Sequence, residues 1–397
     1  MVQQTLTDIF GSYSTNVKGV FRNKDVLSHT YIPDMTLHRE QQIKTLASIL
    51  APAVRGSNIS NCFLYGKTGT GKTMVATHVT HEIQKASDRV RVFYVNCKMR
   101  GVSDTEYRLL AELSRMLGRQ VPITGLPTDE VYNIFYSALN GLNKNVILVM
   151  DEIDALVSKI GDGILYNITR EKIEGTKLSI VGISNSVSFL ETIDPRVKSS
   201  LSEEELIFAP YNSRQLADIL NYRAGQAFED GVLQGGVVEK CSALAAQEHG
   251  DARKALDLLR IAGELAEREK STKVEVRHVD MAEDKLDSDR VIEVLINQPK
   301  QSMAVLSAII KLVDSKAKDI QTGDIFSVYE SMCPELGLKC LTQRRVSDLI
   351  AELDMLGIIN TKVISKGRYG RTREIRIQIN NATQAKIRRI LKDNYML

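Results

Sequence analysis

The 397-residue sequence lacks any apolar run near the ~20 residues that a membrane-spanning helix requires. Its first residues, Met1-Val2-Gln3-Gln4-Thr5, also lack the basic-then-apolar pattern of an export signal. No internal repeat or low-complexity tract occurs in the sequence. We therefore expect a globular cytoplasmic protein that has no membrane partner.

Cysteine is scarce and scattered. The five cysteines are odd in number and form no C-x-x-C pair, so they support neither a disulfide framework nor a zinc site. His78 and His81 lie three positions apart, but no Asp, Glu or Cys nearby completes a set of metal ligands. We expect the cysteines to be small core residues: Cys62, Cys97, Cys241, Cys333 and Cys340.

The net charge of +3 is unevenly distributed. Residues 341–397 contain 12 Lys and Arg against 5 Asp and Glu, a balance of +7, which leaves 40 against 44, or −4, for residues 1–340. A basic C-terminal module on a mildly acidic body indicates a polyanionic partner. A solvated basic surface is the alternative that charge alone leaves open.

Short apolar runs of strand composition alternate with helical stretches over the first half of the chain. Such alternation predicts an α/β fold in which helices cover both faces of a parallel sheet, here in a domain of residues 1–212. Residues 213–287 carry only helical periodicity and predict a small helical lid. The expected strands are residues 62–65, 92–95, 146–150, 178–183 and 206–208.

Residues 288–397 change character along their length. Helical segments at 291–296, 303–313 and 325–333 are followed by a helix over 342–356, whose apolar face comprises Val346, Leu349, Ile350, Leu353 and Leu356. Two β-rich runs, 358–365 and 371–379, then flank a basic, glycine-containing tip. Helices followed by a basic β-hairpin predict a winged-helix domain.

The eight residues that directly follow the first predicted strand match the phosphate-binding loop of nucleotide hydrolases. Glycines let backbone N–H groups curl round phosphates, and the following helix N-terminus adds its positive dipole end. Lys72 is expected to reach the β- and γ-phosphates and Thr73 to place its hydroxyl on Mg²⁺. A glycine-rich turn with a chance lysine is the alternative. The loop consists of Gly66, Lys67, Thr68, Gly69, Thr70, Gly71, Lys72 and Thr73.

The predicted strand at 146–150 ends in Asp151 and Glu152. Asp151 is expected to hold Mg²⁺ through water, and Glu152 to polarise the attacking water as a general base. A strand capped by solvated acids is the alternative. Because one strand-helix unit separates this pair from the phosphate loop, we favour the second half of a nucleotide hydrolase site.

Three further polar side chains follow later elements. Asn185 comes after the next predicted strand and is a candidate to orient water or touch the γ-phosphate. Arg196 follows a turn, and Arg253 lies in the first turn of a predicted helix. Arginine in such places can stabilise phosphate charge, in cis or from a neighbouring subunit. A turn residue and two surface salt bridges are the alternatives.

This ordered series resembles the motifs of AAA+ ATPases. Residues 38–43, 97–132, 250–256 and 367–373 are moreover similar to the archaeal replication initiators of the origin-recognition and cell-division-cycle type, over about residues 20–380. The basic winged-helix ending makes the resemblance specific, because other AAA+ proteins lack it. The resemblance implies an AAA+ P-loop sheet, a helical lid and a winged-helix domain.

The resemblance also implies roles for single residues. It assigns Tyr31, Ile32 and Pro33 to an adenine pocket for ATP or ADP, Asn185 and Arg253 to the two sensors, and Arg196 to the arginine finger. The family pattern often carries another arginine where this chain has Ser199 and Ser200, which leaves the finger open. An initiator-specific insertion at about 98–130, including Arg100, is expected to meet DNA beside the wing.

The charged C-terminal module fits duplex DNA. Polar residues at the start of the helix over 342–356 suit a major groove, and the basic hairpin tip suits a minor groove. Protein contact by the winged helix is the alternative. The predicted DNA-binding residues are Arg100, Thr342, Gln343, Arg344, Arg345, Ser347, Lys366, Arg368, Tyr369, Arg371 and Arg373.

The leading hypothesis is an ATP-regulated initiator that binds origin DNA and helps recruit or load the replicative helicase, with other initiator copies or paralogues as further partners. Its slow ATPase activity acts as a switch, and the protein is associated with the chromosome. The alternatives are a clamp-loader-like or branch-migration AAA+ ATPase, and a nucleotide-gated transcription regulator.

Overall fold

The computed structural model describes residues 19–393, apart from positions 32, 34, 100, 102, 172, 187, 202–203, 316–319, 366–370 and 378–380. The chain divides into two compact units, residues 1–279 and 280–397. Among the described residues, no helix has both the length and the apolar character needed to span a membrane.

The first unit contains a parallel five-stranded sheet in the order β2-β3-β4-β1-β5. Strand β3 is buried along its whole length, as expected for a strand whose two faces are both covered. The order places β1, which precedes the phosphate loop, beside β4 and only one strand from β3. The strands are β1 Cys62–Tyr65, β2 Val90–Asn96, β3 Asn145–Asp151, β4 Lys177–Ser184 and β5 Glu204–Ile207.

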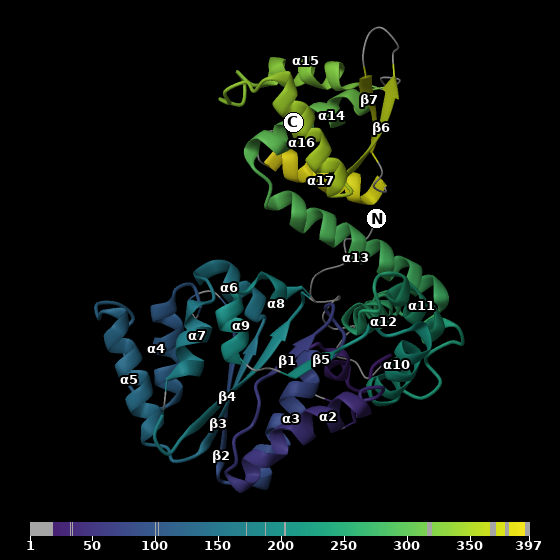
Figure 1. The fold of residues 1–397 in the computed structure, drawn as a ribbon. Helices are drawn as coiled ribbons and strands as arrows, with labels where there is room; N and C mark the ends of the chain where they lie inside the picture. The colour runs from purple at the N-terminus through teal and green to yellow at the C-terminus, as the bar shows by residue number, and fades with distance from the viewer. Residues whose placement is uncertain are drawn as a thin grey trace. The chain divides into compact units, whose positions relative to one another are not determined.

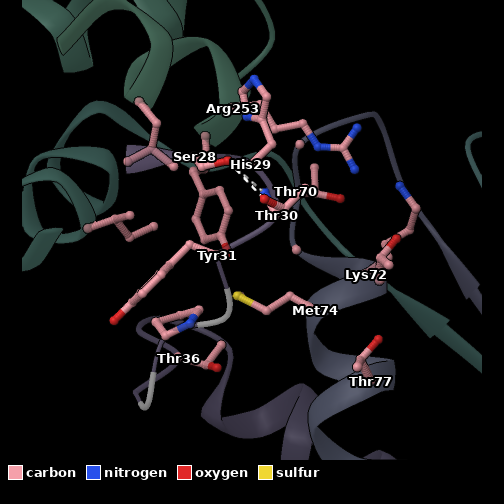
Figure 2. Close-up of a pocket in the computed structure, with 18 of the residues that line it drawn as sticks. Ser28, His29, Thr30, Tyr31, Thr36, Thr70, Lys72, Met74, Thr77 and Arg253 are labelled. Carbon is pink, nitrogen blue, oxygen red and sulfur yellow. Dashed lines mark hydrogen bonds between the residues drawn. The ribbon is translucent and has the colours of Figure 1, made fainter. Parts of the chain in front are cut away.

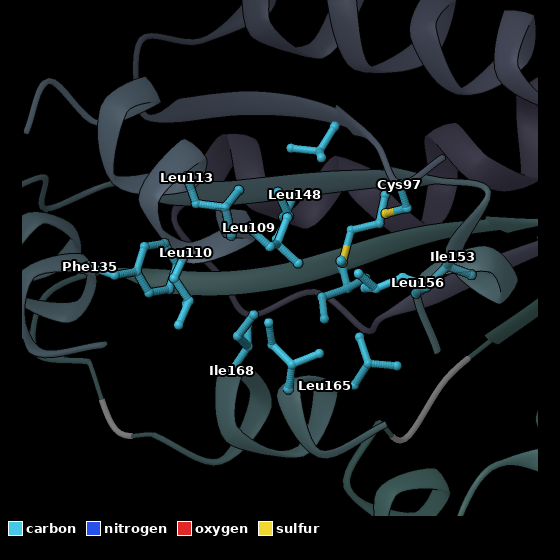
Figure 3. Packing of buried hydrophobic residues seen from close by; sticks show 14 of the residues in the cluster. Cys97, Leu109, Leu110, Leu113, Phe135, Leu148, Ile153, Leu156, Leu165 and Ile168 are labelled. Carbon is cyan, nitrogen blue, oxygen red and sulfur yellow. The ribbon is translucent and has the colours of Figure 1, made fainter. Parts of the chain in front are cut away.

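Alternate residues of the strands face two separate cores, one on each side of the sheet. Leu148 and Met150 face the side covered by α4–α9, whereas Ile147 and Val149 face α2 and α3 (Figures 1 and 3). The predicted two-sided α/β sheet is therefore confirmed. The helices are α2 Glu40–Leu50, η2 Ala51–Arg55, α3 Lys72–Ala86, α4 Glu106–Met116, α5 Thr128–Asn140, α6 Ile153–Ile160, α7 Gly163–Arg170, α8 Phe189–Thr192 and α9 Pro195–Leu201.

A helical lid follows the sheet, as predicted. It contains α10 Ser213–Ala227, α11 Val237–Gln247 and α12 Ala252–Arg268. Asn212 begins α10 with a capping box, in which its side chain accepts from the Gln215 N–H. The segment before α2, including η1 Lys24–Leu27, packs on the lid: the Phe21 and Phe228 ring centroids are 4.7 Å apart.

Helix α13 Val276–Ile296 contains the boundary between the two units. The second unit has its own apolar core, built from α14 Lys300–Asp314, α15 Thr322–Met332, α16 Gln343–Met355 and an antiparallel hairpin of β6 Ile359–Ser365 and β7 Arg371–Ile377. The predicted winged helix is confirmed. A final helix, α17 Asn381–Asp393, was not predicted, and its buried Ile387 and Leu391 close the core.

Two details of the sequence interpretation are wrong. Cys340 is exposed in the connection between α15 and α16, whereas the other four cysteines are buried, so it is not a core residue. Leu356 is 37% exposed because it follows the last turn of α16, where the apolar face of that helix has already ended.

Gly182 tests the packing of the sheet. A Cβ at this position would lie 2.5 Å from Cε1 of Phe63, inside one of the two cores. We predict that Gly182→Ala destabilises the first unit by about 1–3 kcal/mol, the usual effect of overpacking a core. The matched control is Gly225→Ala within α10, where a Cβ meets nothing within 4 Å. It should stabilise the lid by about 0.5–1 kcal/mol. Urea unfolding followed by circular dichroism measures both, and equal effects would contradict the packing assignment.

Candidate functional site

A cavity of about 510 Å³ lies in the first unit where the carboxyl ends of β3 and β4 meet the start of α3, the start of α12 and the segment before α2. Figure 2 shows Lys72 and Thr77 on α3, Arg253 from the lid, and Tyr31 on the N-terminal segment. Ligands of parallel α/β sheets collect at this edge. Gly69–Thr73 line the cavity, whereas Gly66, Lys67 and Thr68 do not.

The phosphate loop depends on two glycines. Gly69 has a φ of +69°, and a Cβ there would lie 1.7 Å from Oδ1 of Asp251 in the lid. At Gly66 a Cβ would lie 2.4 Å from the Phe208 carbonyl oxygen. These approaches allow the loop backbone to pass between β5 and the lid, which leaves room for phosphate oxygens on its cavity side.

Lys72 is buried in the centre of the loop. Its Nζ donates to the carbonyl oxygens of Gly66 and Lys67, both at 2.7 Å, and to Oδ1 of Asn185 at 2.9 Å. Burial lowers the Lys72 pKa to about 8, although the nearby Asp151 carboxylate opposes that shift. The structure thus brings Lys72 and Asn185, two of the predicted site residues, into direct contact.

Asp151 and Thr73 also meet. The Thr73 hydroxyl donates to Oδ2 of Asp151 at 2.8 Å, and the Glu152 N–H donates to Oδ1 at 2.9 Å. A hydroxyl beside a carboxylate, next to a phosphate loop, is the oxygen donor set that Mg²⁺ favours. These two residues therefore fit that ion.

Glu152 lines the cavity in a strained conformation. Its φ of +55° and ψ of +46° are left-handed, which is uncommon for residues other than glycine. Such strain persists where surrounding structure enforces it, and it is frequent at functional sites. The Lys98 Nζ lies 3.4 Å from Oε2 of Glu152, so the two side chains form an ion pair.

The lid touches the phosphate loop directly. Asp251 begins α12 by accepting from the Arg253 N–H at 2.7 Å. The next amide, that of Ala252, donates to the Gly69 carbonyl oxygen at 3.2 Å. Arg253 is exposed and lines the cavity, and its charge contributes to the lowered Lys72 pKa. The predicted lid arginine therefore faces the predicted phosphate position.

The far end of the cavity is held by a residue that the sequence interpretation missed. Arg223 on α10 donates to the carbonyl oxygens of Val26 at 2.9 Å and Tyr31 at 3.2 Å, and its guanidinium lies 4.6 Å from the Tyr31 ring centroid. Burial lowers the Arg223 pKa below its usual value. Pro33 lines the same end, and Ile32 lies outside the described residues.

Arg39 is the second residue whose role was missed. Its buried guanidinium donates to the carbonyl oxygens of Thr70, at 3.0 Å, and Ala209, at 2.6 Å. It also lies 4.0 Å from the Tyr211 ring centroid. The side chain thus ties the phosphate loop to the segment between β5 and the lid. The segment 38–43 was singled out only for its resemblance to the initiator family, and nothing in it indicated that Arg39 reaches the phosphate loop.

Arg196 is not brought into the cavity. It lies on α9, its side chain is 83% exposed, and it pairs with Asp194 at 3.1 Å. That pairing raises the Arg196 pKa and lowers the Asp194 pKa. Arg196 therefore does not contribute to the cavity of its own chain. Arg100 lies outside the described residues.

The second unit presents the predicted DNA-binding residues on α16 and the hairpin. Thr342 begins α16, and its hydroxyl accepts from the Arg345 N–H. Arg345 pairs with Glu352 at 3.2 Å on the same helix, whereas Arg344 is exposed and has no such partner among the described residues.

Only some of the remaining predicted DNA-binding residues lie in the part of the chain that the structure describes. The Arg373 guanidinium donates to the Ser347 carbonyl oxygen at 3.1 Å, which joins the hairpin to α16. Gln343 is exposed at the first position of α16, and Arg371 begins β7 opposite Ser365. Lys366, Arg368 and Tyr369 lie outside the described residues.

Comparison with known proteins identifies three successive domains. Residues 55–185 match an AAA domain, residues 217–284 a Cdc6 AAA+ ATPase-type lid domain, and residues 293–385 a CDC6 C-terminal winged-helix domain. The chain is 50% identical to the ORC1-type DNA replication protein of Thermococcus onnurineus, covering 99% of this chain and 95% of that protein. It is also 50% identical to that of Pyrococcus furiosus, covering 95% and 91%.

A solved structure extends the comparison. The Aeropyrum pernix Orc1 protein in complex with DNA is 44% identical and has a TM-score of 0.77, covering 92% of this chain and 96% of that chain. The Cdc6 protein of Pyrobaculum aerophilum, at 21% identity and a TM-score of 0.61, shares the fold.

Gly69 tests the fit between phosphate loop and lid. We predict that Gly69→Ala weakens triphosphate binding at least tenfold, because the added Cβ would displace Asp251 as well as strain the backbone. Gly56→Ala is the matched control, since its φ is +79° but nothing lies within 4 Å of the added Cβ. Binding of a fluorescent triphosphate distinguishes them. Equal losses would show that backbone strain alone, and not the lid contact, matters.

Proposed function

Since the chain belongs to the archaeal Orc1/Cdc6 family of AAA+ DNA replication proteins, we propose that it is an ATP-regulated initiator that binds origin DNA and helps load the replicative helicase. The observation that carries this proposal is the phosphate loop under a lid, in the same chain as a basic winged helix. Nucleotide state and DNA binding are thus carried by one polypeptide.

The cavity holds ATP or ADP. The phosphates of the nucleotide lie along Gly69–Thr73, where the loop N–H groups and the start of α3 favour negative charge. Its adenine lies toward Tyr31 and Pro33, at the end that Arg223 fixes. Lys72 and Asn185, which are already joined, face the γ-phosphate.

Thr73 and Asp151 are the residues that would hold Mg²⁺, and the ion would neutralise charge on the β- and γ-phosphates. Glu152 then orients and deprotonates the attacking water, and the strained backbone at this position directs its side chain into the cavity.

Hydrolysis acts as a slow switch between two states and drives no motor stroke. The first unit has one phosphate loop, and its lid residue Arg253 senses whether the γ-phosphate is present. Arg196 acts from a neighbouring initiator copy, which agrees with its exposure and with its absence from the lining of the cavity of its own chain.

The winged helix binds duplex DNA, which makes the protein chromosome-associated. Gln343 and Arg344 start α16 and are exposed, so they suit the base edges of a major groove. Similarity to the Aeropyrum pernix Orc1 protein, solved in complex with DNA, supports this assignment. The basic hairpin and the insertion around Arg100 extend the contact.

Glu152 provides the test of the hydrolytic role. We predict that Glu152→Gln lowers ATP turnover at least 100-fold while leaving ATP affinity within about threefold, because only the base is lost. Phosphate release and equilibrium binding measure the two quantities. Glu191→Gln, an exposed change on α8, should alter neither. Unchanged turnover in Glu152→Gln would remove this residue from its proposed role.

Arg344 and Arg345 test the DNA surface as adjacent residues. We predict that Arg344→Ala weakens binding to an origin duplex about tenfold or more, because its guanidinium has no partner on α16. Arg345→Ala should have a smaller effect, because Arg345 is held by Glu352. Fluorescence anisotropy at two salt concentrations measures both. If both variants bind like wild type, the α16 surface is not the DNA site.

A further inference from the structure

Two hydroxyls converge on one oxygen of Asp151. The Thr73 hydroxyl donates to Oδ2 at 2.8 Å, and the Tyr94 hydroxyl donates to the same oxygen at 2.6 Å. The other carboxylate oxygen, Oδ1, accepts from the Glu152 N–H at 2.9 Å. Three donors from three elements therefore fix the orientation of a carboxylate that is only 6% exposed.

Tyr94 lies on β2, an edge strand of the sheet, in register with Val149 of β3. The residue is 40% exposed and lines the cavity. It belongs to neither of the two apolar cores. Its ring therefore contributes little packing, and its hydroxyl is the part that touches functional residues.

The hydrogen bond between Tyr94 and Asp151 has one direction. A phenol hydroxyl beside a carboxylate donates its hydrogen, and the carboxylate oxygen accepts it.

We propose that Tyr94 is a positioning residue for the magnesium site, whose hydroxyl holds the Asp151 carboxylate in the orientation that Mg²⁺–nucleotide binding requires. The inference rests on the proposed function, because Asp151 and Thr73 are the metal-binding residues of that proposal. Groups that hydrogen-bond to metal-binding residues set their orientation, and their removal typically lowers metal affinity tenfold or more.

The test uses the full-length chain and a fluorescent adenine nucleotide, titrated with Mg²⁺. For Tyr94→Phe we expect the Mg²⁺ concentration at half-maximal tight binding to rise about tenfold. Nucleotide affinity in EDTA should stay within twofold, because the base and phosphate contacts of the loop are intact. The change keeps the ring, so the thermal unfolding midpoint should not move.

Tyr107→Phe is the matched control. It removes a hydroxyl that donates to the Pro122 carbonyl oxygen at 2.8 Å, away from Asp151, and should leave the Mg²⁺ midpoint unchanged. An unchanged midpoint in Tyr94→Phe would overturn the proposal. A lower midpoint would also overturn it, since Tyr94 would then compete with the metal. An equal loss of nucleotide affinity with and without Mg²⁺ would show that Tyr94 has only a structural role.

The wild-type titration separates this inference from the proposed function. If wild type shows no Mg²⁺-dependent nucleotide binding, the proposed nucleotide site fails and the role of Tyr94 fails with it. If wild type shows that dependence and Tyr94→Phe shares its midpoint, only the inference about Tyr94 is lost.

Discussion

A phosphate loop must keep its N–H groups directed at the ligand and still hold one backbone conformation without it. Here that conformation is held from several sides: Lys72 binds two carbonyl oxygens of its own loop, and Arg39 binds a third. The lid amide of Ala252 binds a fourth, that of Gly69. The carbonyl oxygens of the loop thus accept hydrogen bonds from the protein, and the N–H groups of the loop remain available to bind phosphate.

The hydrogen bonds that hold the loop and the cavity link parts of the chain that are distant in sequence. Arg39 lies before α2 and reaches both the loop and Ala209, at the start of the lid connection. Arg223 lies in the lid and reaches back to Tyr31. The cavity is therefore lined by the N-terminal segment, the phosphate loop and the lid, so a nucleotide bound there in the proposed way would contact all three.

Local patterns in the sequence were sufficient for the strands of the sheet and for the phosphate-loop and strand-end residues that line the cavity. The glycines with Lys72, and the Asp151-Glu152 strand end, have fixed spacing and strand context, so their convergence followed from parallel-sheet geometry. Arg39, Arg223 and Tyr94 had no such signal, because each acts through a contact more than 30 residues away. Helix α17 was missed because its apolar stripe is narrow, with Ile387 and Leu391 among many polar residues.

Hydrogen exchange of the full-length protein, with and without Mg²⁺ and an ATP analogue, tests most directly whether nucleotide binding is shared among loop, lid and N-terminal segment. We predict slower exchange in residues 66–73, in 250–256 of the lid and in 26–37 before α2. The same protection should weaken at 250–256 when ADP replaces the analogue. Protection confined to residues 66–73 would contradict the account.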